Sequence, residues 1–367
     1  MAKRISIAQP SIGRRELEAA RRVLESGQLR AGPVTEKFER EFARLAGARF
    51  AVAVNSGTSA LFLAASVLVG PGEEVIVPDF TFVATASMVL AAGARPVFAD
   101  VDPRTFTLDP SDAERRITPR TRAMIPVHLY GRPAAMAPLL RLARKYRLKI
   151  IWDAAQAHGA KYQGRDVGSF PDVVCYSFYP TKNMTTGEGG MLVTSNARLA
   201  RELRLMRSHG ESGRYRHVRL GYNFRMTDLA SALGLEQLWR LEITNRRRRQ
   251  NAAALCRGLQ GTRGIELPEE DPSVQHVYNS FTVRLDTSVL GMSRDEFRRR
   301  LAERGIETAV HYPRPLSRQP LFHGSGSDCP VSKQLARAVL SLPVHPALSR
   351  ADLERIIRAV REVAKGN

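Results

Sequence analysis

Short apolar runs alternate with helical patterns between residues 50 and 194, and this alternation limits most strongly what the chain can fold into. Each run is continuously apolar, as in strands that are buried on both faces. Strands interleaved with helices favour a mostly parallel sheet with right-handed crossovers. The predicted strands are Phe50–Val54, Glu74–Pro78, Arg95–Ala99, Arg122–Val127, Lys149–Trp152, Val173–Tyr176 and Gly190–Thr194. The predicted helices between them end at Val69 or span 82–92 and 134–146.

The pattern changes after about residue 224. The elements predicted outside the alternation are helices over 14–26, 35–46, Met226–Leu259, 293–304 and 350–364, and a strand over 278–286. A length of 367 residues suits two domains. We therefore expect an α/β chain with a large domain over 1–245 and a small α+β domain over 246–367. The N-terminal segment is expected to pack on the small domain.

The charge sum is +20, from 56 basic and 36 acidic residues. This sum fits nucleic-acid binding, but it also fits a general preference for arginine, because 48 of the bases are arginine and only 8 are lysine. The bases are spread along the chain, and Arg246–Arg249 is the one dense run. Net charge bears on association rather than on fold. We expect no specific nucleic-acid partner.

Composition and missing motifs argue against several other classes. Cys175, Cys256 and Cys329 are an odd number without a CxxC pair, which disfavours a disulfide framework or a cysteine zinc site and favours a reducing compartment. The longest apolar stretch, Ala60–Gly70, is too short to cross a bilayer. We expect a cytoplasmic protein with no membrane partner and no metal. The motifs of dinucleotide enzymes, P-loop NTPases, zincins and α/β-hydrolases are missing.

Two segments combine small or acidic residues with predicted strand ends. Asn55–Ser59 lies between a strand and a helix, where free backbone N–H groups can bind an anion such as phosphate; small residues are also common at ordinary turns. Asp153 follows the strand Lys149–Trp152, at the sheet edge where ligands bind in open α/β folds. An N-cap for the following segment is the alternative for Asp153.

The third segment, Ser177–Gly190, contains Lys182. In a chain that uses arginine for charge, a lysine indicates that the amine itself is needed, because lysine can lose its proton and form a Schiff base. The alternative is a solvated loop lysine. An anion cradle, a strand-end Asp153 and a lysine 29 residues later are together the parts of a pyridoxal phosphate site. There, the lysine holds the aldehyde and the carboxylate pairs with the pyridine nitrogen.

The sequence resembles the DegT/DnrJ/EryC1/StrS family of pyridoxal phosphate-dependent sugar aminotransferases from about Ser6 to Val363. The motifs behind the resemblance are Asn55–Ser59, Val77–Thr85, Pro126–Gly131, Asp153–Gly159, Ser177–Lys182, Thr185–Gly190, Gly221–Met226 and His311–Pro313. The resemblance implies fold type I, in which helices sandwich a mostly parallel seven-stranded sheet and a smaller α+β domain follows.

The resemblance also implies roles around the cofactor ring. Lys182 would form the internal aldimine and move the proton during transfer, and Asp153 would pair with the pyridine nitrogen. Gln156 would hydrogen-bond the O3′ oxygen of the cofactor. Phe82 would stack on the ring face.

Other residues would bind the phosphate and the substrate. Gly57, Thr58 and Ser177 would hold the phosphate of the cofactor, and Asn223 would reach it from the neighbouring subunit. The active sites would therefore be shared in a homodimer. The candidates for substrate contact are Tyr312, His311 and Tyr215, the last in the loop around Ser208–Tyr222.

The implied reaction is a ping-pong transfer of the amino group of L-glutamate to a keto-sugar linked to a nucleotide diphosphate. The sequence Thr-Thr-Gly-Glu-Gly-Gly over Thr185–Gly190 favours amination at C4, because relatives acting at C3 often carry Gly-Ala-Leu-Gly-Asp-Gly-Gly there.

Two alternatives would keep the fold: an aminocyclitol aminotransferase and a dehydratase-like relative. Lys182 argues against the dehydratases, which carry His. A cofactor-binding, nucleic-acid-binding regulator is the alternative of another class. The sequence leaves open the sugar, its nucleotide, the amination position, glutamate versus glutamine as donor, the pathway and any assembly beyond a dimer.

Overall fold

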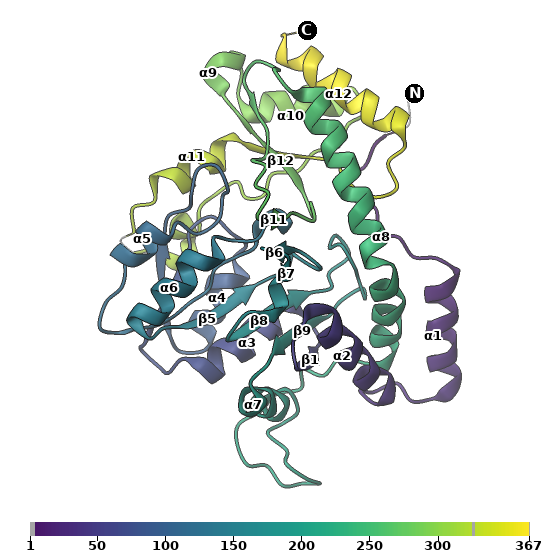
Figure 1. The fold of residues 1–367 in the computed structure, drawn as a ribbon, viewed down its shortest axis with the longest axis vertical. Coiled ribbons are helices and arrows are strands. Elements are labelled where there is room, and N and C mark those ends of the chain that lie inside the picture. Colours follow the sequence, from purple (N-terminus) through teal and green to yellow (C-terminus); the bar gives the residue numbers. More distant parts are fainter. Residues whose placement is uncertain (1–3, 325–326, 367) are drawn as a thin grey trace.

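A seven-stranded sheet lies at the centre of the computed structural model, which describes residues 4–324 and 327–366 (Figure 1). The strand order is β1-β9-β8-β5-β4-β2-β3. The strands are β1 (Phe50–Val54), β2 (Glu74–Pro78), β3 (Arg95–Ala99), β4 (Thr121–Met124), β5 (Lys149–Asp153), β8 (Val173–Ser177) and β9 (Gly190–Thr194). β9 runs antiparallel to both of its neighbours, and the other pairs are parallel. The predicted mostly parallel α/β sheet is confirmed.

Helices cover both faces of this sheet. The helices of the first two-thirds of the chain are α1 (Arg14–Ser26), α2 (Pro33–Ala46), α3 (Gly57–Leu68), α4 (Ala84–Ala91), α5 (Pro110–Arg115), α6 (Met136–Tyr146), α7 (Ala197–Arg207) and α8 (Asp228–Leu259). One apolar cluster joins the sheet to α2, α6 and the first half of α8. A second cluster joins the opposite face to α3, α4 and α7. Successive residues of β5 point into the two clusters in turn, which explains why its sequence is continuously apolar.

The C-terminal part of the chain adds a small sheet, β10-β12-β13, with its own helices. Its elements are β10 (Ile265–Glu266), β12 (Phe281–Leu285), β13 (Val339–Leu342), α9 (Thr287–Leu290), α10 (Arg294–Glu303), α11 (Pro330–Ala338) and α12 (Arg350–Ala364). A third apolar cluster includes Ile5, Phe281, Phe297, Ile356 and the second half of α8. The 32-residue helix α8 therefore contributes to both the large and the small core (Figure 1). Ile5 pairs with Ile306 in an isolated bridge, and both belong to this third cluster, so Ile5 packs into the small core.

Part of the C-terminal region returns to the large sheet. Leu316, Phe322 and Cys329 belong to the same apolar cluster as α3 and α4. Leu335 and Val339 pack with residues that follow β2, β3 and β4. The domain limits at 245 and 246 stay a prediction, but these contacts attach Leu316, Phe322, Cys329 and α11 to the large sheet.

Two smaller features complete the fold. A three-stranded sheet consists of β6 (Lys161–Tyr162), β7 (Arg165–Asp166) and β11 (Val274–Gln275). The loop over 208–222 projects from the body beyond α7, at the lower end of Figure 1. Within residues 4–324 and 327–366, no helix is long and apolar enough to cross a membrane.

Candidate active site

A cleft of about 520 Å³ opens where the carboxyl ends of β5 and β8 face the small sheet. Nine of the predicted site residues line it: Gly57, Thr58, Phe82, Asp153, Gln156, Ser177, Lys182, His311 and Tyr312. We call Gly57, Thr58, Asp153, Ser177 and Lys182 the polar floor. We call Ile7, Ala8, Ala309, Leu342 and Val344, which also line the cleft, the apolar wall.

The N-terminus of α3 lies against the end of β8 at one end of the polar floor. Ser56 caps α3 by accepting a hydrogen bond from the amide of Ser59 at 3.0 Å. A Cβ atom on Gly57 would lie 2.6 Å from Cβ of Ser177, so a larger residue would push the helix away from the strand. The amides of Gly57 and Thr58 have no acceptor among residues 4–324 and 327–366. Free amides at a helix N-terminus, with the hydroxyls of Thr58 and Ser177, suit a phosphate.

Asp153 ends β5 and is 4% exposed. Its Oδ2 atom accepts a hydrogen bond from the Thr85 hydroxyl at 2.9 Å, and its Oδ1 atom accepts one from the amide of Ala155 at 3.1 Å. Burial raises the pKa of Asp153, against the effect of these two hydrogen bonds. A buried carboxylate held in this way would gain from a cationic partner in the cleft.

Lys182 lies in the connection between β8 and β9. Burial lowers the pKa of its amine to about 8, although the negative charge of Asp153 acts in the opposite direction. An amine with such a pKa can act as a nucleophile and as a proton carrier near neutral pH.

Three asparagines support the Lys182 loop from behind. Nδ2 of Asn183 donates to Oδ1 of Asn245 on α8 at 2.8 Å and to the carbonyl oxygen of Val277 at 3.0 Å. Nδ2 of Asn279 donates to Oδ1 of Asn183 at 3.1 Å and to the carbonyl oxygen of Thr181 at 3.2 Å. The residues on both sides of Lys182 are therefore fixed to α8 and to the segment that enters the small sheet.

Gln156 has a fixed amide orientation. Its Oε1 atom accepts a hydrogen bond from the backbone amide of Tyr130 at 2.6 Å, and its Nε2 atom donates to the Tyr312 hydroxyl at 3.2 Å. The ring of Tyr312 lies 6.0 Å from that of Phe82. Phe82 is 54% exposed, which is high for so apolar a side chain.

Two predicted site residues lie outside the cleft of this chain. Asn223 is exposed and pairs with Ser208 in an isolated bridge. Tyr215 is 80% exposed in the projecting loop. Neither lines the cleft. The role predicted for Asn223 already places it in the cleft of a neighbouring subunit, and the substrate contact of Tyr215 stays a prediction.

The cleft also contains residues that the sequence analysis did not predict. The apolar wall, Tyr179 and Asn279 line it, and Thr85 bonds Asp153. Thr85 lies within the motif Val77–Thr85 and could have been chosen as a hydroxyl near the sheet edge. No local pattern marks the wall residues, because they come from three segments far apart in the sequence.

The donor set fits pyridoxal phosphate. The space that only glycine leaves at position 57 and the free amides beside it suit the phosphate. The buried carboxylate of Asp153 suits a protonated pyridine nitrogen, and the exposed ring of Phe82 suits an aromatic face.

Comparisons with known proteins agree with this geometry. The model of the DegT/DnrJ/EryC1/StrS aminotransferase family matches residues 10–361. The chain is 44% identical to the dTDP-3-amino-3,4,6-trideoxy-alpha-D-glucose transaminase of Streptomyces venezuelae, over 96% of this chain and 93% of the relative. It is 42% identical to the UDP-N-acetyl-3-dehydro-alpha-D-glucosamine 3-aminotransferase of Acidithiobacillus ferrooxidans, over 94% of this chain and 92% of the relative.

Solved structures give the same result. The structure of S. venezuelae DesV with a ketimine intermediate has a TM-score of 0.92 and 44% identity, and the match covers 95% of this chain and 94% of that one. The sugar aminotransferase Spr1654 of Streptococcus pneumoniae in its PLP form has a TM-score of 0.93 and 30% identity, with 99% of both chains covered. The chain therefore belongs to the DegT/DnrJ/EryC1/StrS aminotransferase family, and it is a pyridoxal phosphate-dependent sugar aminotransferase.

Proposed function

We propose that the enzyme transfers the amino group of L-glutamate to a keto-sugar linked to a nucleotide diphosphate, in two successive half-reactions. The observation that carries this proposal is the placement of Lys182 and Asp153 in one cleft with the free N-terminus of α3. The bound cofactor supplies the aldehyde and the electron sink. In our proposal Asp153 keeps the pyridine nitrogen protonated, and Gln156 directs its amide hydrogens at the O3′ oxygen.

Lys182 is proposed to accept the proton from the donor carbon in one half-reaction and to return it to the sugar carbon in the other. With a pKa of about 8, roughly a tenth of the amine is neutral at pH 7. The loop has the rigidity for this task, because the side chain of Asn183 and the carbonyl group of Thr181 are both hydrogen-bonded.

The nucleotide and the position of amination have two candidate answers. The hexapeptide Thr185–Gly190 favours C4, and the names of two full-length relatives place their own chemistry at position 3 of dTDP- and UDP-linked sugars. A panel of 3-keto and 4-keto nucleotide sugars, with the product position assigned by NMR, separates the two. Keto-inositols in the same panel test the aminocyclitol alternative.

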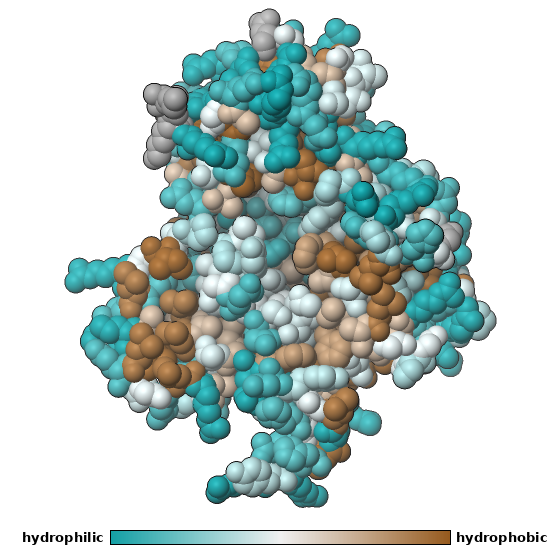
Figure 2. Space-filling model, turned by 180° about the vertical axis from the view of Figure 1, so that it is seen from behind, coloured by the Kyte–Doolittle hydropathy of each residue, from teal (hydrophilic) through white to brown (hydrophobic). Residues whose placement is uncertain are grey.

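We further propose a homodimer with shared sites. Asn223 and Tyr215 lie on or next to the projecting loop, which also carries Arg214, Arg216 and Arg219 and suits an anionic ligand in a partner's cleft. The face in Figure 2 has apolar patches on its α1 side and over α4. Exposed apolar side chains of α1 and α8 include Leu17, Leu24, Trp239 and Ile243. Patches of this kind mark protein interfaces.

We also propose that the protein is cytoplasmic, because its three free cysteines suit a reducing compartment.

Borohydride reduction tests the lysine role and the donor together. The protein with bound cofactor should be yellow and should lose that colour on addition of glutamate. A separate sample that is reduced before any glutamate is added should carry a pyridoxyl mass on the Lys182 peptide. A spectrum that glutamate leaves unchanged while glutamine changes it would replace the proposed donor. A pyridoxyl mass on another lysine would overturn the assignment of Lys182.

A further inference from the structure

Asp79 follows β2 and ties a distant turn to the large sheet. It is 0% exposed. Its Oδ1 atom accepts a hydrogen bond from the amide of Ser317 at 2.6 Å, and its Oδ2 atom accepts one from the hydroxyl of Ser317 at 2.8 Å. Its backbone oxygen accepts from Leu316 at 2.8 Å, and its amide donates to Ala99 on β3 at 2.8 Å. One residue thus joins the ends of two strands to a turn more than 230 positions away.

Both segments that meet at Asp79 continue into the cleft. Phe80 and Phe82 follow Asp79, and Tyr312 precedes Ser317 by five residues. The ring of Tyr312 lies 6.3 Å from that of Phe80 and 6.0 Å from that of Phe82. Phe82 and Tyr312 line the cleft, whereas Phe80 is buried behind them. The contact at Asp79 therefore joins the two segments that carry these rings.

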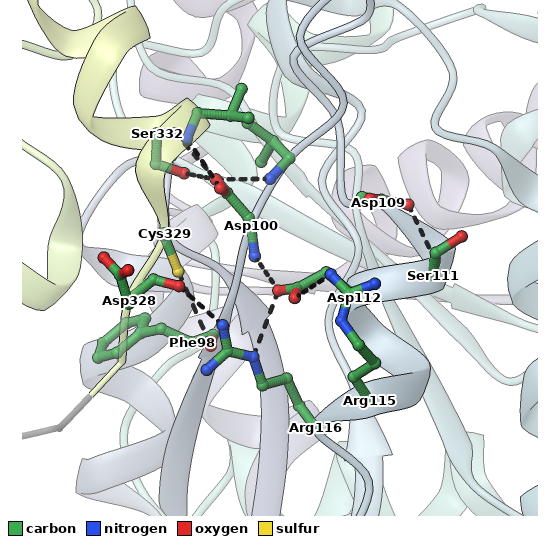
Figure 3. Close-up of polar contacts among 12 residues, drawn as sticks. Phe98, Asp100, Asp109, Ser111, Asp112, Arg115, Arg116, Asp328, Cys329 and Ser332 are labelled. Carbon is green, nitrogen blue, oxygen red and sulfur yellow. Dashed lines mark hydrogen bonds and ion pairs between the residues drawn. The ribbon is translucent and has the colours of Figure 1, made fainter.

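A second aspartate holds the next part of the same region (Figure 3). Asp100, which follows β3, accepts hydrogen bonds from two amides at the start of α11, at 2.8 Å each, and from the Ser332 hydroxyl at 2.6 Å. Asp112 in turn accepts from the amide of Asp100 at 2.6 Å and pairs with Arg116. Asp100 thus anchors α11 on the sheet, and Asp79 anchors the turn nearer Tyr312. Gln156 holds the hydroxyl of Tyr312 itself, and the side chain of Tyr130 bonds the neighbouring His311 carbonyl oxygen.

A buried negative charge on Asp79 would lower the stability of the fold. Among residues 4–324 and 327–366, no lysine or arginine forms an ion pair with it. Burial accordingly raises the pKa of Asp79. A buried carboxylate without a cation lowers stability unless its hydrogen bonds compensate. Two strong acceptor atoms on one short side chain fix both the amide and the hydroxyl of Ser317, which a serine or alanine at this position could not do.

We propose that Asp79 is a positioning residue that seats the Ser317 turn on the sheet and thereby holds the ring of Tyr312 against Phe82. Its consequence for catalysis rests on the proposed substrate contact of Tyr312. The placement of the ring can be measured without turnover.

Nitration of Tyr312 by tetranitromethane, followed by peptide mass spectrometry of the enzyme with bound cofactor, tests this placement. A held, buried phenol reacts slowly, because burial raises the pKa of Tyr312. Asp79→Ala should raise the rate about tenfold, which corresponds to the loss of one or two hydrogen bonds. Asp79→Asn keeps an acceptor and should restore most of the protection. Tyr146, exposed on α6, is the internal standard.

Two further variants guard against a general loss of folding. Asp109 caps α5 by accepting from the amide of Ser111 at 2.9 Å (Figure 3). Its side chain has no hydrogen bond to the Ser317 turn among the described residues, so Asp109→Ala should leave Tyr312 protected. Ser317→Ala removes only the hydroxyl contact and should raise nitration about twofold. Equal nitration rates in wild type, Asp79→Ala and Ser317→Ala would overturn the proposal.

A kinetic cycle separates positioning from a merely structural role. Asp79→Ala should lower kcat/KM for the keto-sugar about tenfold when Tyr312 is present and less than twofold in a Tyr312→Ala background. Equal losses in both backgrounds would contradict action through Tyr312. If Tyr312→Ala alone leaves the sugar kinetics unchanged, the proposed substrate contact is wrong, and the nitration rates still decide the role of Asp79.

Discussion

In the polar floor, Asp153 and Ser177 are the last residues of β5 and β8, the N-terminus of α3 comes shortly after β1, and Lys182 lies five residues after β8. In the apolar wall, Ile7, Ala309 and Val344 come from three segments that are up to 337 residues apart and meet at the cleft. The floor provides hydrogen-bond donors and acceptors whose positions are fixed by further hydrogen bonds. The wall provides apolar side chains that determine the shape of the cleft. Single polar substitutions in the floor should therefore change kcat by orders of magnitude. Substitutions in the wall should change KM for the sugar only severalfold.

The largest effect is expected from Lys182→Ala. Removal of the amine takes away both the covalent hold on the cofactor and the proton carrier, so kcat should fall by about 10⁴-fold or more. Stopped-flow measurement of the donor half-reaction checks this, with circular dichroism as the control for folding. A residual rate within tenfold of wild type would mean that another group carries the proton.

Asp153→Asn should lower kcat by about 10²–10³-fold, the range for removal of one preorganised charge. Thr85→Val, which removes the hydrogen bond to Oδ2 and keeps the charge, should cost far less. Steady-state kinetics at saturating cofactor tests the pair. Equal losses in the two variants would show that orientation of the carboxylate, rather than its charge, is what the floor provides.

The lowered pKa of Lys182 predicts its chemical reactivity. A pKa of about 8 means that the amine loses its proton at lower pH than an ordinary lysine, so at pH 7 the neutral fraction is roughly two to three hundredfold larger. In cofactor-free protein, acylation of Lys182 should therefore exceed that of exposed lysines between pH 7 and 8, as measured by peptide mass spectrometry. Asp153→Asn should shift this titration further down, because Asp153 holds the pKa up. A titration that stays near 10 would contradict the described burial.

Asn245→Ala removes the partner of Asn183 and should lower kcat about tenfold with little change in KM. Asn251→Ala is the matched control, because Asn251 lies on the same helix, is equally buried, and bonds the carbonyl oxygens of Val344 and His345 instead. Both variants should lose similar stability in thermal unfolding. If kcat falls equally in both, the asparagines support the fold and not the lysine.

The smallest effect on catalysis is expected from a substitution in the apolar wall. Val344→Ala opens space in the cleft and should change KM for the sugar by about fivefold, with the glutamate half-reaction unaffected. Val363→Ala makes the same truncation in the small core, away from the cleft, and should lower only the melting temperature. An effect of Val344→Ala on both half-reactions would break the division between floor and wall.

The sequence predicted the floor better than the wall, for physical reasons. Strand ends are visible as apolar runs, and β1, β2, β3 and β9 have the predicted limits. β4 ends at Met124 instead of Val127, before Pro126, which has no amide hydrogen. The antiparallel direction of β9 was not predicted; it follows from the connection over 178–189, which has no crossover helix.

Several other elements were missed as well, although α7 and α11 each bury one face at helical spacing. The helices α5, α7 and α11 and the strand β13 were absent from the sequence prediction. The tie between Asp79 and Ser317 spans 238 positions, and no local pattern encodes such a contact. The wall depends on the same kind of long-range packing, so its residues could be recognised only in the folded chain.

The continuity of α8 has a consequence for engineering. A helix of 32 residues is about 48 Å long, and its two halves belong to different cores. The small sheet cannot move away from the large one unless α8 bends, so the continuous helix sets the width of the cleft. The range of sugars that the enzyme accepts then depends on the volume of the side chains in the apolar wall. A library restricted to Ala309, Leu342 and Val344 would vary the accepted sugar while Lys182 and its supports stay untouched.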